Sequence, residues 1–212
     1  MRFGEVCSKR MLLRKRDLTI QLQSIQTHPQ PKVRLEQYTV PADLAAEILF
    51  QACYVHDDIE RKSIIDLGTG TGRFAIGTAL LGADYVIGVD SDEPALKIAQ
   101  ANARRLKLKI DWVLGEIDPL RGLVDTVVMN PPFGTKEEHA DTRFLKVALR
   151  LASVVYSIHK TSTRGFLVRW LDRHKTHPEV IISDKLEIAH QFQFHRKRRQ
   201  YVDVDVYRIQ QS

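Results

Sequence analysis

Residues 63–72 read Ser-Ile-Ile-Asp-Leu-Gly-Thr-Gly-Thr-Gly and carry a strong structural signal. The first five residues are mostly apolar and β-branched, which predicts a buried strand over 63–67. The glycines at alternate positions predict a tight turn, because glycine tolerates positive φ and lets the backbone approach a ligand. A helix is expected over 73–81, so the stretch forms the strand–turn–helix unit of an α/β sheet.

The same alternation of strands and helices continues along the chain. Further strands are expected over 85–89, 110–114, 124–129, 154–158, 180–188 and 201–209. This order predicts an α/β fold with a doubly wound, mainly parallel seven-stranded sheet and right-handed crossovers. Upstream, Leu18, Leu22 and Ile25 recur at helical spacing and predict an N-terminal helical extension over 1–30. A single domain is expected over 31–212 and begins with an amphipathic helix over 42–54.

Composition indicates an ordinary globular chain. Hydrophobic residues make up 43% of the 212 residues and charged residues 27%. No apolar run approaches the roughly 20 residues that a membrane-spanning helix needs, so no membrane association is expected. The two cysteines lack metal or disulfide spacing, which favours a reducing, cytoplasmic location. The scattered histidines predict no metal site.

The net charge of +6 is concentrated near the two ends of the chain. One basic cluster comprises Arg10, Arg14, Lys15 and Arg16, and the other comprises His195, Arg196, Lys197, Arg198 and Arg199. Basic clusters of this kind favour a polyanionic partner such as a nucleic acid. Ordinary solvated surface charge is the alternative interpretation.

Four residues, Asn130-Pro131-Pro132-Phe133, follow the strand expected over 124–129. A double proline cannot continue a strand, so the motif lies at a carboxyl end, where open α/β sheets bind ligands. The Asn130 side-chain oxygen and the Pro131 carbonyl are suited to accept the two hydrogens of a planar amine. Holding them restores the nitrogen lone pair in the transition state. Phe133 would stack on a base, although a strand-ending turn with a buried Phe is the structural alternative.

The turn over 66–72 departs from the dinucleotide fingerprint G-x-G-x-x-G/A, because its third glycine comes one residue early. A D-x-G-x-G-x-G turn instead resembles the S-adenosylmethionine loop of class I methyltransferases. Asp90, at the end of the next strand, would accept the ribose hydroxyls, although an acid there serves nicotinamide cofactors equally well. Glu116 lies where such enzymes hold the adenine amino group, and Gly115 would leave room for the ring.

Longer blocks make the resemblance specific. They are Leu35 to Tyr38, Asp66 to Gly72, Met129 to Lys136, Tyr156 to Arg164, Phe194 to Lys197, and Val202 to Val206. Together they resemble the methyltransferase-like protein 5 family and its archaeal relatives, which methylate N6 of an adenosine in small-subunit ribosomal RNA. The resemblance covers most of the chain from about residue 30. It implies a Rossmann-like class I methyltransferase fold, S-adenosylmethionine as the cofactor, and RNA as the partner.

The resemblance also implies site residues. The catalytic set is Asn130, Pro131, Pro132 and Phe133. The resemblance matches Gln37, Gly68, Thr71, Asp90 and Asn130 to cofactor-site positions of the family. The expected cofactor set also contains residues placed beside them by the sequence: Tyr38, Thr39, Val40, Asp66, Gly70, Gly72, Gly115 and Glu116. Charge and position, rather than the resemblance, give the expected RNA-binding residues: Lys136 and Lys160, close to strand ends, and the cluster His195, Arg196, Lys197, Arg198 and Arg199. For Lys136 and Lys160, ordinary surface solvation is the alternative. The family commonly places a Thr beside the Pro that follows Gln-Tyr, whereas this chain has Thr39-Val40-Pro41, so the choice between Thr39 and Val40 stays open. Glu116 stands where family members often have an Asp.

Eukaryotic members of the family work with a small zinc-containing activator protein that adds a strand alongside the sheet, which makes such a protein an expected partner. Two other functions remain open. The N-P-P-F site also serves guanine-N2 methylation of RNA and methylation of a release-factor glutamine, and a non-catalytic RNA-binding protein could keep the same fold. A peptide substrate would not require the basic cluster near the C-terminus.

Overall fold

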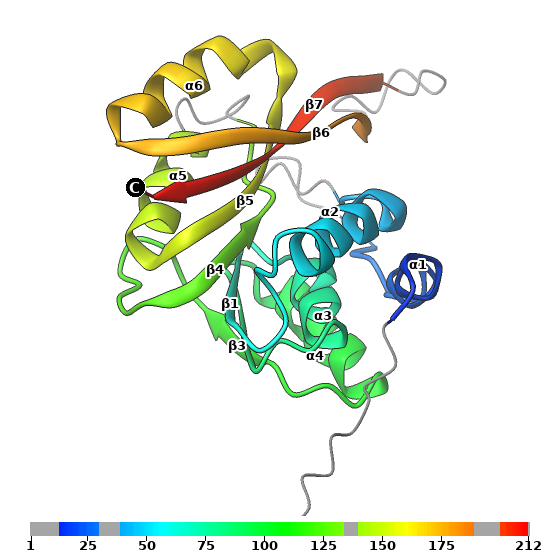
Figure 1. Ribbon diagram of the computed structural model, residues 1–212. Helices are drawn as coiled ribbons and strands as arrows, with labels where there is room; N and C mark the ends of the chain where they lie inside the picture. Colours follow the sequence, from blue (N-terminus) through cyan, green and yellow to red (C-terminus); the bar gives the residue numbers. More distant parts are fainter. Residues whose placement is uncertain (1–12, 30–38, 134–139, 189–199, 212) are drawn as a thin grey trace, which may run out of the picture.

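The computed structural model describes residues 13–29, 39–133, 140–188 and 200–211. Within these residues the strands form one seven-stranded sheet in the order β3-β2-β1-β4-β5-β7-β6 (Figure 1). The strands are β1 (Ser63–Leu67), β2 (Tyr85–Asp90), β3 (Asp111–Leu114), β4 (Val124–Met129), β5 (Ala152–Lys160), β6 (Thr176–Ile188) and β7 (Gln200–Gln211). Strands β1 to β5 pair in parallel, and β7 runs antiparallel to both of its neighbours. The predicted mainly parallel α/β sheet is confirmed.

Helices cover both faces of this sheet. They are α1 (Lys15–Gln23), α2 (Ala42–Tyr54), α3 (Arg73–Leu80), α4 (Glu93–Arg105), α5 (Ala140–Leu151) and α6 (Arg164–Arg173), with a short 3-10 turn η2 (Thr161–Thr163). Successive residues of β1 point to opposite faces, so Ile64 joins the core under α1 to α3 and Ile65 joins the core under α5 and α6. Figure 1 shows the two groups of helices on opposite sides of the sheet.

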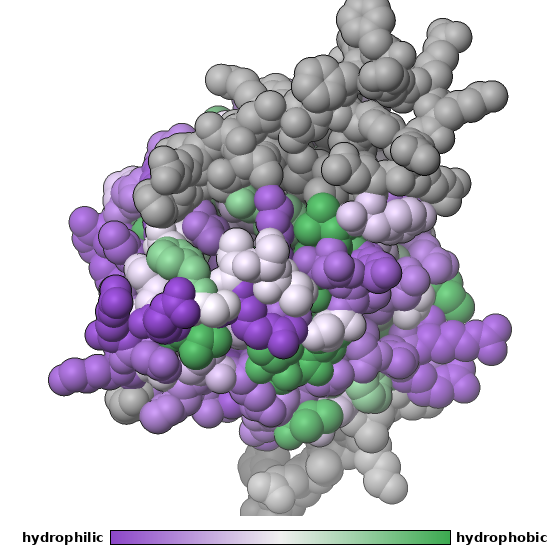
Figure 2. All heavy atoms as spheres, turned by 90° about the horizontal axis from the view of Figure 1, so that it is seen from above, coloured by the Kyte–Doolittle hydropathy of each residue, from purple (hydrophilic) through white to green (hydrophobic). Residues whose placement is uncertain are grey.

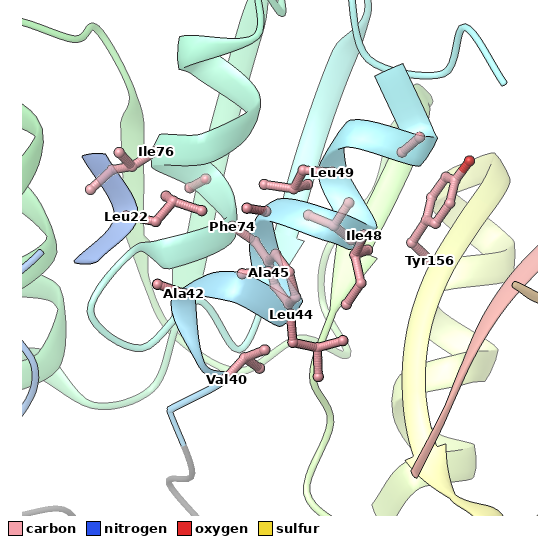
Figure 3. Close-up of a cluster of buried hydrophobic side chains, with 14 of the residues drawn as sticks. Leu22, Val40, Ala42, Leu44, Ala45, Ile48, Leu49, Phe74, Ile76 and Tyr156 are labelled. Atoms are coloured by element: carbon pink, nitrogen blue, oxygen red, sulfur yellow. The ribbon is translucent and has the colours of Figure 1, made fainter. Parts of the chain in front are cut away.

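The helix α2 lies at the centre of the first core. Its Leu44, Ile48 and Leu49 are buried, and Figure 3 shows Leu22 of α1 on one side of the helix and Tyr156 of β5 on the other. Leu18 and Leu22 are fully buried, so α1 packs into the same core as the sheet. The helical spacing of apolar residues in the N-terminal extension therefore reflects burial against α2 and α3.

Several element boundaries differ from those that the sequence predicts, most of them by one or two residues. Strand β6 spans Thr176–Ile188, so it contains the predicted stretch 180–188 and extends four residues before it, past Pro178. Proline is tolerated at a sheet edge, where its missing N–H leaves no broken ladder. Strand β5 spans Ala152–Lys160 and is two residues longer at each end than the predicted strand over 154–158. Among the described residues, no helix combines the length and apolarity needed to cross a membrane.

Candidate active site

The carboxyl ends of β1, β2 and β4 bring the predicted site residues together. Leu67, the last residue of β1, pairs with Val89 on one side and with Met129 on the other. Asp90 and Asn130 are the residues that follow those two partners, so they flank the turn that begins at Gly68. The sheet therefore places the glycine turn between the acid and the Asn-Pro-Pro-Phe motif, as the parallel topology predicts.

The glycine turn adopts the backbone conformation that its sequence predicts. Gly68, Gly70 and Gly72 have φ values of 71°, 54° and 88°, a region that side chains disfavour. At Gly72 a Cβ would also lie 2.9 Å from the Trp112 ring. Among the residues that the structure describes, by contrast, no atom lies within 4 Å of a Cβ placed at Gly70 or Gly115. The turn is thus closed on its inner side and leaves open space beside these two glycines, which fits a cofactor approaching the backbone.

The buried Asp66 side chain holds this turn by hydrogen bonds. The side chain is only 1% exposed, and its Oδ2 accepts hydrogen bonds from the Thr69 hydroxyl (2.6 Å) and the Ala75 backbone N–H (2.9 Å). Burial raises the pKa of Asp66 to about 7, although both hydrogen bonds oppose that rise and nearby Asp90 adds to it. The carboxyl group therefore ties the start of the turn to the first turn of α3.

Asp90 is held by backbone donors. Its Oδ2 accepts from the Gly70 N–H at 2.7 Å, and its Oδ1 accepts from the Asp92 N–H at 2.8 Å. Burial raises the pKa of Asp90, while these N–H groups partly offset the effect. A fixed carboxylate oxygen retains further lone pairs, so Asp90 can accept hydroxyl donors without losing its backbone contacts.

The residues that follow β3 carry a second acidic group. The Gly115 N–H donates to the Asp90 backbone carbonyl at 3.0 Å, which fixes this chain beside the β2 end. The Glu116 side chain is 63% exposed and accepts a hydrogen bond from Arg143 at 3.0 Å. Arg143 also pairs with Asp118, and hydrogen bonding to that carboxylate is the main reason why the pKa of Arg143 is raised. Glu116 thus lies where the sequence predicts, but in an ion pair that the sequence did not indicate.

The Asn-Pro-Pro-Phe motif lies directly after β4, with Asn130 partly buried. The Phe133 ring is 9% exposed and packs in the core under α2. The Lys160 ammonium, at the end of β5, lies 5.6 Å from the centre of this ring. The aromatic face that we predicted for base stacking is therefore mostly covered in this structure.

The remaining predicted site residues divide into two groups. One group lies outside the described residues and comprises Gln37, Tyr38, Lys136 and the cluster His195 to Arg199. Thr39 and Val40 are described, and they differ: Thr39 is exposed, whereas Val40 is buried in the core. The Val40 carbonyl accepts a hydrogen bond from Arg73 at 2.8 Å, which connects this segment to the start of α3.

Other residues at this edge were missed by sequence reasoning. His159 is buried in β5, where its Nε2 lies 2.7 Å from the Ser157 hydroxyl and its Nδ1 lies 3.8 Å from Asp141. The Phe144 ring of α5 packs against Gly68, where an added Cβ would lie 3.2 Å from it. Asn102 is buried in α4 and bonds the Thr71 carbonyl. The block Tyr156 to Arg164 was a signal for His159, but nothing in the pattern singled out Asn102 or Phe144.

The sheet order, the glycine turn after β1 and the acid after β2 define a class I S-adenosylmethionine-dependent methyltransferase. The sequence model of the ribosomal protein L11 methyltransferase family matches residues 51–130, a part of the chain that ends at Asn130. A solved structure from Pyrococcus horikoshii, described as a candidate RNA methyltransferase, is 40% identical, with a TM-score of 0.84 over 95% of this chain and 99% of that one.

Two relatives match over almost their full length. The rRNA N(6)-adenosine-methyltransferase Mettl5 of Drosophila melanogaster is 37% identical, covering 93% of this chain and 97% of the relative. The METTL5 protein of Danio rerio, with the same description, is 36% identical, covering 93% and 99%. The chain therefore belongs to the methyltransferase-like protein 5 (METTL5) family, as the sequence resemblance predicted, and its cofactor is S-adenosylmethionine.

Proposed function

We propose that this enzyme methylates N6 of an adenosine in structured RNA, specifically small-subunit ribosomal RNA. The observation that carries the proposal is the nearly full-length similarity to two rRNA N6-adenosine methyltransferases, combined with Asn130 beside the glycine turn. The match to the ribosomal protein L11 methyltransferase family ends at Asn130, so cofactor binding is shared with protein methyltransferases. We assign acceptor choice to the residues beyond it.

We assign cofactor binding to the residues at the ends of β1, β2 and β3. Gly68, Gly70, Thr71 and Gly72 form the wall against which the amino-acid end lies, Asp90 accepts the ribose hydroxyls, and Gly115 and Glu116 face the adenine. Because Arg143 also holds Asp118, Glu116 can turn toward an adenine amine without leaving Arg143 unpaired. The family resemblance adds three residues to this cofactor site: Gln37, Tyr38 and either Thr39 or Val40. Asp66 supports the turn through its hydrogen bonds to Thr69 and Ala75.

Bound S-adenosylmethionine supplies an electrophilic methyl group on a sulfonium. The chain's task is to orient the amine and to restore its lone pair. In this proposal the Asn130 side-chain oxygen and the Pro131 carbonyl accept the two N6 hydrogens, which stabilises the nitrogen as it becomes tetrahedral. The N–C bond forms as the S–C bond breaks, and the amine proton becomes acidic only afterwards, so water can accept it. Asn130 and Pro131 thus orient the reaction without a strong base.

A flipped base needs an aromatic surface, and the buried position of Phe133 constrains how it is supplied. The Lys160 ammonium lies over the ring, 5.6 Å from its centre, so the adenine would displace Lys160 or use the other face. Either arrangement places Lys160 near the RNA, consistent with its proposed role as a phosphate contact. We propose that Phe133 becomes accessible when the substrate binds.

The strand register supports RNA binding by the second basic cluster, His195 to Arg199. Lys160 at the carboxyl end of β5 pairs with Val204, and β7 begins four residues earlier at Gln200, whose partner in β6 is Ile188. The connection between β6 and β7 therefore starts and ends on the same edge as Asn130. This placement would let the cluster bind phosphates while the target base enters the site. Seen from above, the described surface is mainly hydrophilic with small hydrophobic areas (Figure 2).

We further propose a small zinc-containing activator protein as a partner that adds a strand at the β3 edge. Strand β3 is the end of the described sheet on this side, and two of its four residues, Val113 and Leu114, are exposed apolar side chains. An apolar edge strand of this kind favours pairing with another chain. A cytoplasmic location is also proposed, where reducing conditions keep thiols such as the buried Cys53 free.

The proposed reaction is tested with purified protein and radiolabelled S-adenosylmethionine. Small-subunit ribosomal RNA and a release factor are offered separately, and the labelled nucleosides are separated after digestion. Label in N6-methyladenosine is the expected result. Label in N2-methylguanosine, or in the release factor, would preserve the cofactor assignment and refute the proposed acceptor.

A further inference from the structure

The segment that follows α1 is joined to the cofactor edge through one side chain. The Gln26 N–H donates to Asn102 Oδ1 at 3.0 Å, and Asn102 Nδ2 donates to the Gln26 carbonyl at 3.0 Å. The same Nδ2 donates to the Thr71 carbonyl at 3.1 Å. One amide therefore connects two backbone segments, one from the N-terminal extension and one from the glycine turn.

The connection explains why an Asn occupies position 102. Asn102 lies inside α4 and is 2% exposed, although Asn is a poor residue for a helix interior. Both amide hydrogens and the oxygen are used, so the two segments and the side chain satisfy one another. Removing the side chain would leave the Thr71 carbonyl without this partner in a buried site and would release the Gln26 backbone groups, which are partly buried.

The same segment, residues 24–28, makes a second contact on the Asp90 side of the proposed cofactor pocket. His28 Nε2 lies 3.6 Å from Asp92 Oδ2, and the Asp92 N–H donates to Asp90 Oδ1 at 2.8 Å. An exposed contact fixes the beginning of the segment, because Arg105 donates to the Ser24 carbonyl at 2.5 Å. Residues 24–28 thus reach the glycine turn through Asn102, and they contact Asp92, which follows Asp90, through His28. These two connections lie on the two sides of the proposed cofactor site.

We propose that residues 24–28 form a brace for the cofactor pocket and that Asn102 is the positioning residue through which the brace holds Thr71. The inference rests on the assignment of the glycine turn to S-adenosylmethionine. A turn held in its binding conformation loses less conformational entropy when the ligand arrives, so the brace increases cofactor affinity. It acts on binding, and the chemical step at Asn130 does not depend on it.

The test compares Asn102→Ala with a matched control, Thr126→Val. Thr126 is also buried and donates one hydrogen bond, to the Asp58 carbonyl at 2.7 Å, but it lies at the amino-terminal side of β4. We expect both variants to lower the melting temperature. Asn102→Ala should weaken S-adenosylmethionine binding about tenfold by calorimetry and raise its KM to match, with kcat at saturating cofactor within about twofold of wild type. Thr126→Val should leave the cofactor Kd unchanged.

A second variant, Arg105→Ala, tests the same brace if Asn102→Ala fails to fold. Arg105 is on the surface, so its loss is not expected to disturb the core. It loosens the brace at Ser24 and should raise the KM for S-adenosylmethionine about two- to threefold, leaving the KM for RNA unchanged. An unchanged cofactor Kd in both brace variants would overturn the inference, as would equal losses in Thr126→Val. Failure of the wild-type protein itself to bind the cofactor would refute the site assignment, and the brace with it.

Discussion

Replacing Asp66 by Asn should remove a pH dependence of stability that is built into the glycine turn. Both hydrogen bonds to this side chain end on the single oxygen Oδ2, so the carbonyl oxygen of the introduced amide can accept them unchanged. The substitution therefore isolates the effect of the charge. Asp66 carries a pKa of about 7 in the folded chain, mainly because of burial, against an ordinary value of 3.8.

The sign follows from which state binds the proton more tightly. Between pH 4 and 7 the folded chain keeps the proton on Asp66, whereas the unfolded chain has lost it, so stability falls as pH rises. At on the order of 1.4 kcal/mol for each pH unit, the full window amounts to about 4 kcal/mol, of which about 3 kcal/mol lies between pH 5 and pH 8. The contribution is complete below the unfolded pKa and lost once pH exceeds the folded value.

The assay is denaturant unfolding of the cofactor-free protein at pH 5, 6, 7 and 8, with wild type and Asp66→Asn side by side. Wild type should lose about 3 kcal/mol relative to the variant across this range. Asp125→Asn is the control, because hydrogen bonds from Ser63 lower the pKa of Asp125, and its contribution is lost only at lower pH. Parallel profiles for wild type and Asp66→Asn would show that the folded carboxyl ionises normally, and the reasoning would be refuted.

Three further predictions test the proposed function. Asn130→Ala should reduce methyl transfer by at least about 100-fold while S-adenosylmethionine affinity stays within a few-fold; a comparable loss of cofactor binding in calorimetry would place Asn130 in the cofactor pocket alone. Neutralising Arg196, Lys197, Arg198 and Arg199 together should weaken RNA binding and flatten its dependence on salt, measured by titration from low to moderate ionic strength; an unaltered slope would leave the cluster without a role in RNA binding. Leu114→Asp should prevent a zinc-containing activator from copurifying without changing cofactor affinity, and an intact complex would exclude the β3 edge as its binding site.

Strands β1 and β4 were predictable because burial on both faces leaves a nearly continuous apolar signal. The predicted bounds of β1 and β4 match the structure, and their parallel pairing brings Asp66, Asp90 and Asn130 to one edge. A general rule about where parallel strands end therefore predicted that these residues lie at one edge, without any knowledge of contacts.

Contacts between distant side chains could not be predicted in this way. The bond between Asn102 and Gln26 joins residues 76 positions apart, and the pairing of Arg143 with Glu116 spans 27 positions. Each depends on how helices lie over the sheet, which periodicity does not specify. The burial of Phe133 is a similar case: the motif indicates an aromatic side chain at the edge, but only the packing under α2 determines how much of the ring is covered.

The structure also separates what fixes the site from what selects its substrate. Asp66 holds the turn, backbone N–H groups hold Asp90, and two prolines limit the backbone after Asn130, so the reacting groups are positioned independently of the RNA. In the mechanism that we propose, the Asn130 side-chain oxygen and the Pro131 carbonyl offer the same two amine acceptors to an amide, a guanine or an adenine. Discrimination among these acceptors must then come from residues that contact the rest of the substrate. The described edge places Lys160 and the ends of β6 and β7 in that position, and this is where we expect changes in acceptor specificity to arise.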